Sequence, residues 1–137
     1  MRIDILTLFP EMFESPLNYS ILKRAQQAGV VNFVLTNIRD FAPDKYKKVD
    51  DKPYGGGPGM VMMPGPVFDC VEHVVGLAPE KPRIILLTPQ GQPFSQAKAM
   101  ELSSQNIGVD GLDSHCPILF LVPSTKSIAQ CRTDALW

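Results

Sequence analysis

The chain has 137 residues, a length that fits one domain and excludes a large multidomain enzyme. Hydrophobic residues make up 45% and charged residues 20% of the composition, which is typical of a globular protein and excludes intrinsic disorder. The formal net charge of −1 supplies no overall basic field for a nucleic acid or a membrane, so any contact with a polyanion must come from a local cluster.

The first half of the chain predicts two strands, one helix and a long loop. Residues 3–9 are nearly all apolar, which is typical of a buried strand. Asn18 is the expected N-cap of a helix that stops at Gly29. The apolar residues of this helix share one face: Ile21, Leu22, Ala25 and Ala28. Residues 30–35 predict a second strand, and residues 37–63 predict a loop long enough to be functional.

The second half predicts two more helices and two more strands. Residues 64–75 have helical spacing, with apolar positions at Val67, Phe68, Val71, Val74 and Val75. Residues 83–87 predict a strand, and Ser95 is expected to cap a helix that ends near Ser103 and turns Ala97, Met100 and Leu102 inward. Residues 117–123 predict the last strand. Strands separated by helical segments indicate an α/β protein with a parallel sheet.

Several classes of site are excluded by what the sequence contains. Cys70, Cys116 and Cys131 lack the spacing of a disulfide framework or a zinc site, so we expect reduced, buried thiols and no metal. We interpret His73 as a packed or surface side chain, and His115 has no visible set of further metal ligands. No apolar run reaches about 18 residues and no signal peptide is present, which favours a cytoplasmic protein without a membrane partner.

A segment rich in glycine and proline gives the strongest local signal. Residues 50–60 read Asp-Asp-Lys-Pro-Tyr-Gly-Gly-Gly-Pro-Gly-Met, with four glycines in the five positions 55–59. Glycine permits positive φ and close approach of a ligand, while proline stiffens the loop. A phosphate-binding P-loop is excluded because no Lys-Ser or Lys-Thr follows, and a dinucleotide motif because no tight strand-to-helix turn is present. A structural turn and a ligand-binding loop both remain open.

Two other segments have both a functional and an ordinary interpretation. Residues 88–91, Thr-Pro-Gln-Gly, follow a predicted buried strand, where backbone groups at the carboxyl end of a sheet bind ligands, although a plain turn is the alternative. Residues 45–48, Lys-Tyr-Lys-Lys, form a local basic cluster that suits RNA phosphates and a stacked base. Flanking acids partly neutralise this cluster, which favours a solvated loop: Asp44, Asp50 and Asp51.

Taken together, three of these segments resemble one known family. Residues 8–13, residues 49–60 with Met62-Met63, and residues 88–91 have the order and spacing of the bacterial tRNA (guanine-N1)-methyltransferases of the TrmD family. Arg39-Asp40-Phe41 also matches the family pattern. The resemblance covers about residues 1–105 and identifies this part as the N-terminal part of a SPOUT methyltransferase domain.

The resemblance implies a fold, a reaction and a set of site residues. Members of the family have a SPOUT-like parallel sheet with flanking helices and a deep trefoil knot, and they act as homodimers. They transfer a methyl group from S-adenosyl-L-methionine to N1 of the guanine 3′ of the tRNA anticodon. The residues implied to bind the methyl donor are Thr88, Pro89, Gln90 and Gly91, with Pro89 against the adenosine. The residues implied to lie beside the guanine are Asp50, Tyr54, Gly55, Gly56, Gly57, Pro58 and Gly59.

Residues 106–137 depart from the family pattern. The rest of the donor pocket, the catalytic base and the C-terminal tRNA-binding domain of the family have no matching segment here, so we expect a divergent tail, an incomplete knot and a truncated family member. Residues 118–122 could still dock as a surrogate strand. Asp50 and Asp51 are the available carboxylates near the motif, but no catalytic residue is assigned. We therefore expect no activity from this chain alone, and the alternative is a non-catalytic fragment that binds a partner or a nucleotide.

Overall fold

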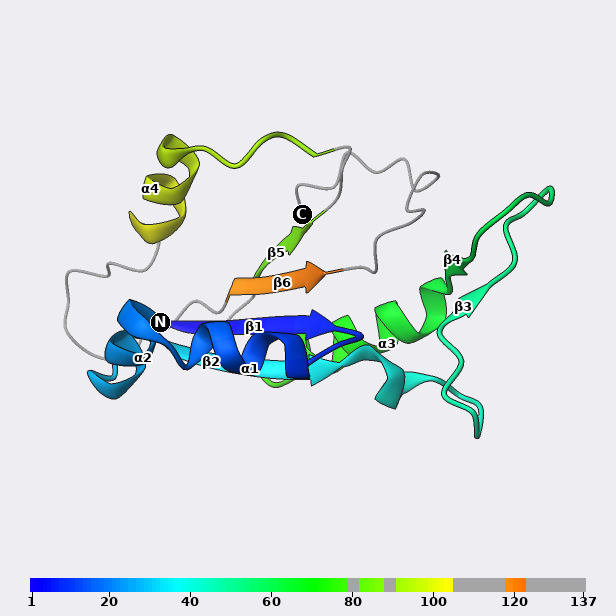
Figure 1. Ribbon diagram of the computed structural model, residues 1–137, viewed down its shortest axis with the longest axis horizontal. Helices are drawn as coiled ribbons and strands as arrows, with labels where there is room; N and C mark the ends of the chain where they lie inside the picture. The colour runs from blue at the N-terminus through cyan, green and yellow to red at the C-terminus, as the bar shows by residue number, and fades with distance from the viewer. Residues whose placement is uncertain (79–81, 88–90, 105–117, 123–137) are drawn as a thin grey trace.

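A parallel four-stranded sheet is the centre of the computed structural model, which describes residues 1–78, 82–87, 91–104 and 118–122. The strand order is β2-β1-β6-β5, and every pairing between neighbours is parallel. The strands are β1 (Arg2–Thr7), β2 (Asn32–Asn37), β5 (Arg83–Leu86) and β6 (Ile118–Val122). The carboxyl ends of all four strands therefore lie at the same edge of the sheet (Figure 1). The expected α/β fold with a parallel sheet is confirmed.

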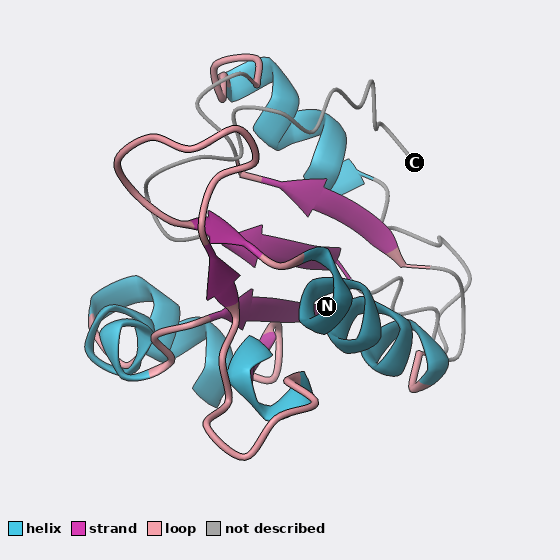
Figure 2. Ribbon diagram, turned by 90° about the vertical axis from the view of Figure 1, so that its right-hand side faces the viewer, coloured by secondary structure: helices cyan, strands magenta, loops and turns pink. Residues whose placement is uncertain are grey.

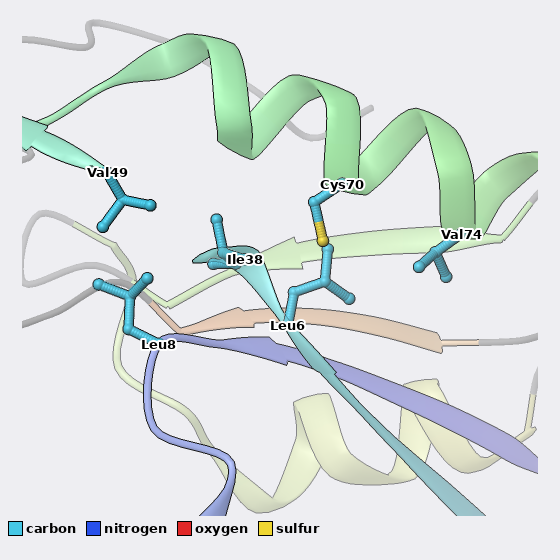
Figure 3. Close-up of a cluster of buried hydrophobic side chains, with 6 residues drawn as sticks. All are labelled: Leu6, Leu8, Ile38, Val49, Cys70 and Val74. Atoms are coloured by element: carbon cyan, nitrogen blue, oxygen red, sulfur yellow. The ribbon is translucent and has the colours of Figure 1, made fainter. Parts of the chain in front are cut away.

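Helices cover both faces of this sheet. They are α1 (Glu11–Leu17), α2 (Ser20–Gln27), α3 (Pro64–Gly76) and α4 (Gln96–Ser104), with a short 3-10 helix η1 (Ile38–Phe41) directly after β2. Figure 2 shows α1 and α2 on the opposite side of the sheet from α3. Figure 3 shows α4 also on the side opposite α3. None of the helices in the described ranges is long and apolar enough to cross a membrane.

The largest buried cluster joins α3 to the carboxyl edge of the sheet. Its members are Leu6, Leu8, Ile38, Val49, Cys70 and Val74 (Figure 3). Leu6 lies in β1 and Leu8 directly follows this strand, and Figure 3 shows both side chains pointing toward α3. Each fully buried side chain of this size contributes about 1.5–3 kcal/mol to folding. The cluster therefore anchors η1 and the residue before β3 to the sheet.

A buried charge lies on β1. The Asp4 carboxylate is only 1% exposed, and Arg2 donates to its Oδ1 atom from Nη2 at 2.8 Å and from Nε at 3.2 Å. A buried carboxylate without such a partner would be strongly destabilising, because the loss of hydration would not be offset. The Arg2 side chain thus permits an acid in an otherwise apolar strand.

The N-terminal helices differ from the expectation in two respects. Asn18 caps the C-terminus of α1 and not the N-terminus of α2, since its backbone N–H donates to the carbonyls of Glu14 and Ser15. The apolar face of α2 is not buried, because Ile21 and Leu22 are exposed. Gly29 is confirmed as the stop after α2, with φ of +69°. The strand expected at residues 30–35 lies two residues later, at Asn32–Asn37.

The other helices were predicted more accurately in extent than in orientation. The expected helix at residues 64–75 is α3, but its buried side chains are spaced four residues apart: Pro66, Cys70 and Val74. Phe68 points away from this face and is exposed. The expected cap at Ser95 is confirmed, because its Oγ accepts from the backbone N–H of Lys98 at 3.3 Å. Of the three residues of this helix expected to point inward, Leu102 is buried, whereas Ala97 and Met100 are exposed.

The last described strand answers one question that the sequence left open. Residues 118–122 do dock as a strand, and β6 pairs with β1 on one side and with β5 on the other. The expected strand at residues 83–87 is β5, which ends at Leu86. The remainder of the expected divergent tail, residues 106–117 and 123–137, lies outside the described residues.

Candidate functional site

Two polar side chains accept backbone hydrogen bonds at the carboxyl edge of the sheet. Thr7 and Asn37 end the neighbouring strands β1 and β2, and they are partners in the strand register. Thr7 Oγ1 accepts from the backbone N–H of Phe9 at 3.2 Å, and Asn37 Oδ1 accepts from that of Arg39 at 3.0 Å. Ligands of open α/β sheets bind outside this edge. The sequence analysis missed both residues, although a polar residue at the end of an apolar strand was a signal for them.

The glycine-rich segment is the loop of a short antiparallel hairpin, which the sequence analysis described only as a loop. Strands β3 (Asp50–Asp51) and β4 (Val61–Met62) pair, with Asp50 opposite Met62. The backbone N–H of Met63 donates to the carbonyl of Val49 at 2.7 Å, which closes the base of the hairpin on a buried valine. Strands of two residues have no detectable sequence period. The hairpin projects from the carboxyl edge of the sheet, with residues 52–60 at its tip (Figure 1).

The hairpin loop has a defined backbone shape. The N–H of Gly56 donates to the carbonyl of Pro53 at 3.1 Å, and Gly55 has φ of +86° at the third position of this turn, as a type II turn requires. Positive φ values recur along the loop, at Gly55, Gly56, Gly57 and Gly59. A Cβ atom at any of these four glycines would meet no atom within 4 Å. The glycines thus serve the backbone conformation, and open space remains on the surface of the loop for a ligand.

The two acids of β3 are in different environments. Asp50 is half-buried, whereas Asp51 is exposed. The carboxylate of Asp51 accepts from the backbone N–H of Lys52 at 2.8 Å and from Lys48 Nζ at 3.1 Å. The backbone hydrogen bond and then the Lys48 ammonium lower the pKa of Asp51. A lowered pKa makes Asp51 a weaker base than an ordinary aspartate.

The basic cluster lies in the loop between η1 and β3, and two of its lysines form ion pairs with carboxylates. Lys47 forms an ion pair with Asp40 and Lys48 forms one with Asp51. The expected neutralisation by flanking acids is therefore confirmed for Asp51, and Asp40 is an additional partner that the sequence analysis did not identify. Tyr46 is 88% exposed.

The residues predicted to hold the methyl donor fall mostly outside the described part of the chain. Thr88, Pro89 and Gln90 are not described, and Gly91 is exposed. Tyr54, Pro58 and the four loop glycines are exposed at the hairpin tip, and Asp50 lies at its base. The hairpin thus brings the predicted substrate residues together, at the edge of the sheet where β5 ends.

The described cysteine and histidine candidates lie in environments that suit a structural role. Cys70 is fully buried, and burial, followed by the nearby charge of Asp40, raises the pKa of its thiol from 9.0 to about 12. His73 is exposed and packs its ring against that of Phe41, with 5.2 Å between the centroids. Cys116, Cys131 and His115 lie outside the described residues. Within the described ranges, no group of three or more His, Cys, Asp or Glu side chains is arranged to hold a metal ion.

Comparisons with known proteins agree on one family. The family model described as tRNA (Guanine-1)-methyltransferase TrmD matches residues 1–109. A tRNA (guanine-N(1)-)-methyltransferase from Anoxybacillus flavithermus is 56% identical over 105 residues, which are 77% of this chain and 43% of the relative. The enzyme of the same name from Geobacillus kaustophilus is 57% identical over 105 residues, with the same coverage. The chain thus spans less than half the length of these relatives.

A solved structure supports the fold. The crystal structure of tRNA (m1G37) methyltransferase from Aquifex aeolicus superimposes with a TM-score of 0.72 at 32% sequence identity. The superposition covers 88% of this chain and 50% of the Aquifex chain.

Proposed function

The chain belongs to the TrmD family of tRNA (guanine-1)-methyltransferases, and on that premise we propose that it forms the front part of a methyl-transfer site for tRNA. The proposed reaction moves a methyl group from S-adenosyl-L-methionine to N1 of the guanine 3′ of the anticodon. The observation that carries the proposal is the placement of the family's glycine-proline motif on a hairpin at the carboxyl edge of the sheet. Its proposed location is the cytoplasm.

The proposed donor site lies where β5 ends. When bound, S-adenosyl-L-methionine supplies an electrophilic methyl group on a sulfonium. We assign Thr88, Pro89, Gln90 and Gly91 to the donor, on the resemblance to the family. The exposed surface of Gly91, five residues after the end of β5 at Leu86, is compatible with this role. The open space beside the hairpin glycines leaves room for a flat base to approach the backbone.

The hairpin residues position the guanine in the proposed reaction. Asp50, Tyr54, Gly55, Gly56, Gly57, Pro58 and Gly59 hold the base with N1 in line with the methyl group. The donor held by residues 88–91 would supply its methyl group to N1 and would depart as S-adenosylhomocysteine. Such positioning supplies a large part of the acceleration. N1 also loses a proton, which requires a base.

The acids near the motif do not supply that base in our proposal. Asp51 is engaged by Lys48 and by the backbone, with its pKa lowered. Asp50 lies at the base of the hairpin, where it pairs with Met62, and the hairpin loop extends beyond this base. In our proposal residues 106–137 are a divergent tail, of which residues 118–122 form β6, and the family match ends inside this range, at residue 109. The 137-residue chain by itself therefore binds the donor weakly and transfers methyl groups negligibly.

A radiolabelled-donor assay on tRNA tests this proposal, with the full-length Geobacillus relative as the positive control. We expect incorporation by the 137-residue chain to be lower by at least about 10²-fold, the lower bound of the contribution of general acid-base catalysis. Asp51→Asn and the exposed, matched Asp69→Asn should leave this residual rate equal. Steady turnover that Asp50→Asn alone abolishes would assign the base to Asp50 and contradict the proposal.

Calorimetry with S-adenosyl-L-methionine separates this function from the alternative of a fragment that binds only a partner or a different nucleotide. Weak binding of S-adenosyl-L-methionine supports the family site if an adenosine nucleotide, titrated in the same way, does not bind. Binding of the nucleotide alone would favour the alternative, and tight binding of the donor would show that the site is complete in this chain.

We also propose that the chain pairs with a second copy, as the family does. The segment of α1 and α2 carries large apolar side chains that the described residues leave exposed: Met12, Tyr19 and Ile21. Tyr19 and Ile21 are 76% and 75% exposed. An exposed group of large apolar side chains is typical of an interaction surface.

A further inference from the structure

The loop of residues 42–49 lies at the same carboxyl end of the sheet as the hairpin, although the two loops extend from β3 in opposite directions. It leaves η1 and enters β3, whereas the hairpin loop leaves β3 and returns through β4 (Figure 1). Each loop presents one tyrosine, since Tyr46 is 88% exposed and Tyr54 is 87% exposed. A nucleic acid that reaches the hairpin therefore has a second aromatic residue within the same end of the molecule.

Two of the lysines in this loop are used to shape it. Lys47 pairs with Asp40 in η1, and Lys48 pairs with Asp51 in β3, so the two ion pairs tie the loop to the elements on both sides. The Asp44 carboxylate accepts from the backbone N–H of Lys48 at 2.8 Å. Lys47 has φ of +51°, a conformation that is costly for a residue with a Cβ atom. These contacts hold a defined turn.

The turn presents Lys45 and Tyr46 at its tip. The N–H of Lys47 donates to the carbonyl of Asp44 at 3.1 Å, which makes Lys45 and Tyr46 the two central residues. Lys45 is exposed, and no carboxylate in the described part of the chain lies within ion-pair distance of it. Sequence letters alone make the three lysines look equivalent, but their pairing separates Lys45 from Lys47 and Lys48.

We propose that this turn is an RNA contact in which Lys45 binds a phosphate and Tyr46 stacks on an unpaired base. Lys47 and Lys48 are positioning residues that shape the turn through their carboxylate partners. The inference rests on the proposed function, because it takes tRNA as the ligand. Aromatic side chains stack on the splayed bases of single-stranded RNA loops, and lysines contact their phosphates.

Fluorescence anisotropy with the whole 137-residue chain and an RNA anticodon stem-loop tests the proposal over a range of salt concentrations. Lys45→Ala should reduce the slope of log affinity against log salt by about 0.7, the value for one lost contact with single-stranded phosphate. Lys23→Ala, which removes an exposed lysine from α2, is the matched control and should leave the slope unchanged.

The stacking role has its own pair of variants. Tyr46→Ala should weaken binding about 10-fold, because one stacked base is lost, whereas Tyr46→Phe should bind as the parent does. Circular dichroism of each variant shows whether its fold is retained. Equal losses for Lys45→Ala and Lys23→Ala would mean that only the general field attracts RNA, and this result, or an absence of RNA binding by the parent, overturns the proposal.

A stem-loop in which the target guanine is replaced by adenine distinguishes the two levels of failure. Binding that depends on the guanine but not on Lys45 or Tyr46 overturns the RNA contact and leaves the proposed function intact. Binding that ignores the guanine, Lys45 and Tyr46 alike contradicts both.

Discussion

At the scale of single residues, environment separates side chains that the sequence presents as equivalent. Asp50 and Asp51 are neighbours, but Asp51 accepts hydrogen bonds from the backbone N–H of Lys52 and from Lys48, and these lower the pKa of Asp51. Because its pKa is lowered, the ionised form of Asp51 stabilises the folded state above the unfolded pKa, and this contribution is lost as the pH falls through the folded value. The sequence motif contains both acids, but it does not show which hydrogen-bond donors surround each carboxylate.

Cys70 provides the sharpest prediction at this scale. Its pKa is raised from 9.0 to about 12, so at pH 8 the thiolate fraction is about 10³-fold lower than that of a free thiol. In a Cys116→Ser/Cys131→Ser background, we expect iodoacetamide to leave the folded chain unmodified. The same sample in urea should react within minutes, and mass spectrometry measures both. Rapid modification of the folded chain would show that Cys70 is accessible.

At the scale of elements, sequence patterns predicted most helices and strands but not the hairpin. The pattern of α3 extends over 13 residues, whereas β3 and β4 have two residues each, too few for any period to show. The hairpin forms because Val49 is buried in the core at one side of its base and Met63 closes the other by a backbone hydrogen bond. Long-range packing, not local preference, makes this element.

Two glycines give opposite predictions at the element scale. Gly55 has φ of +86°, so Gly55→Ala should lower the free energy of unfolding by about 1 kcal/mol through backbone strain. Gly76 is the last residue of α3, has no positive φ and has open space around it, so Gly76→Ala should raise the free energy of unfolding by about 0.5–1 kcal/mol. Urea unfolding measures both values. Changes of the same sign would refute the assigned turn.

At the scale of the whole molecule, α1 and α2 leave apolar side chains exposed in the described part of the chain, which is the basis of the proposed pairing of two copies. The sequence analysis placed Ile21 and Leu22 on one apolar face of the expected helix, and the structure leaves both exposed. An amphipathic pattern shows that a face prefers an apolar neighbour, but it does not distinguish the chain's own sheet from a second copy.

Sedimentation equilibrium checks the proposed pairing of two copies. We expect the parent chain to form dimers and Ile21→Glu to be monomeric, because the interface would bury an unpaired carboxylate. Lys23→Glu, two residues away on the same helix, should remain dimeric. A monomeric parent chain would contradict the proposed pairing. Equal masses for the two variants would show that the pairing surface does not depend on Ile21.

The sequence by itself determined the parallel α/β class, the approximate extent of α3, α4 and β5, and the family, because periodicity and the glycine-proline motif are local properties of the chain. Only the tertiary structure decided that β6 lies between β1 and β5, although the family match ends at residue 109. It also decided that the carboxyl edge carries the hairpin and that, among the described residues, carboxylates form ion pairs with Lys47 and Lys48 but not with Lys45. The physical reason is that strand order, burial and ion pairing depend on residues far apart in the chain, which no local pattern specifies.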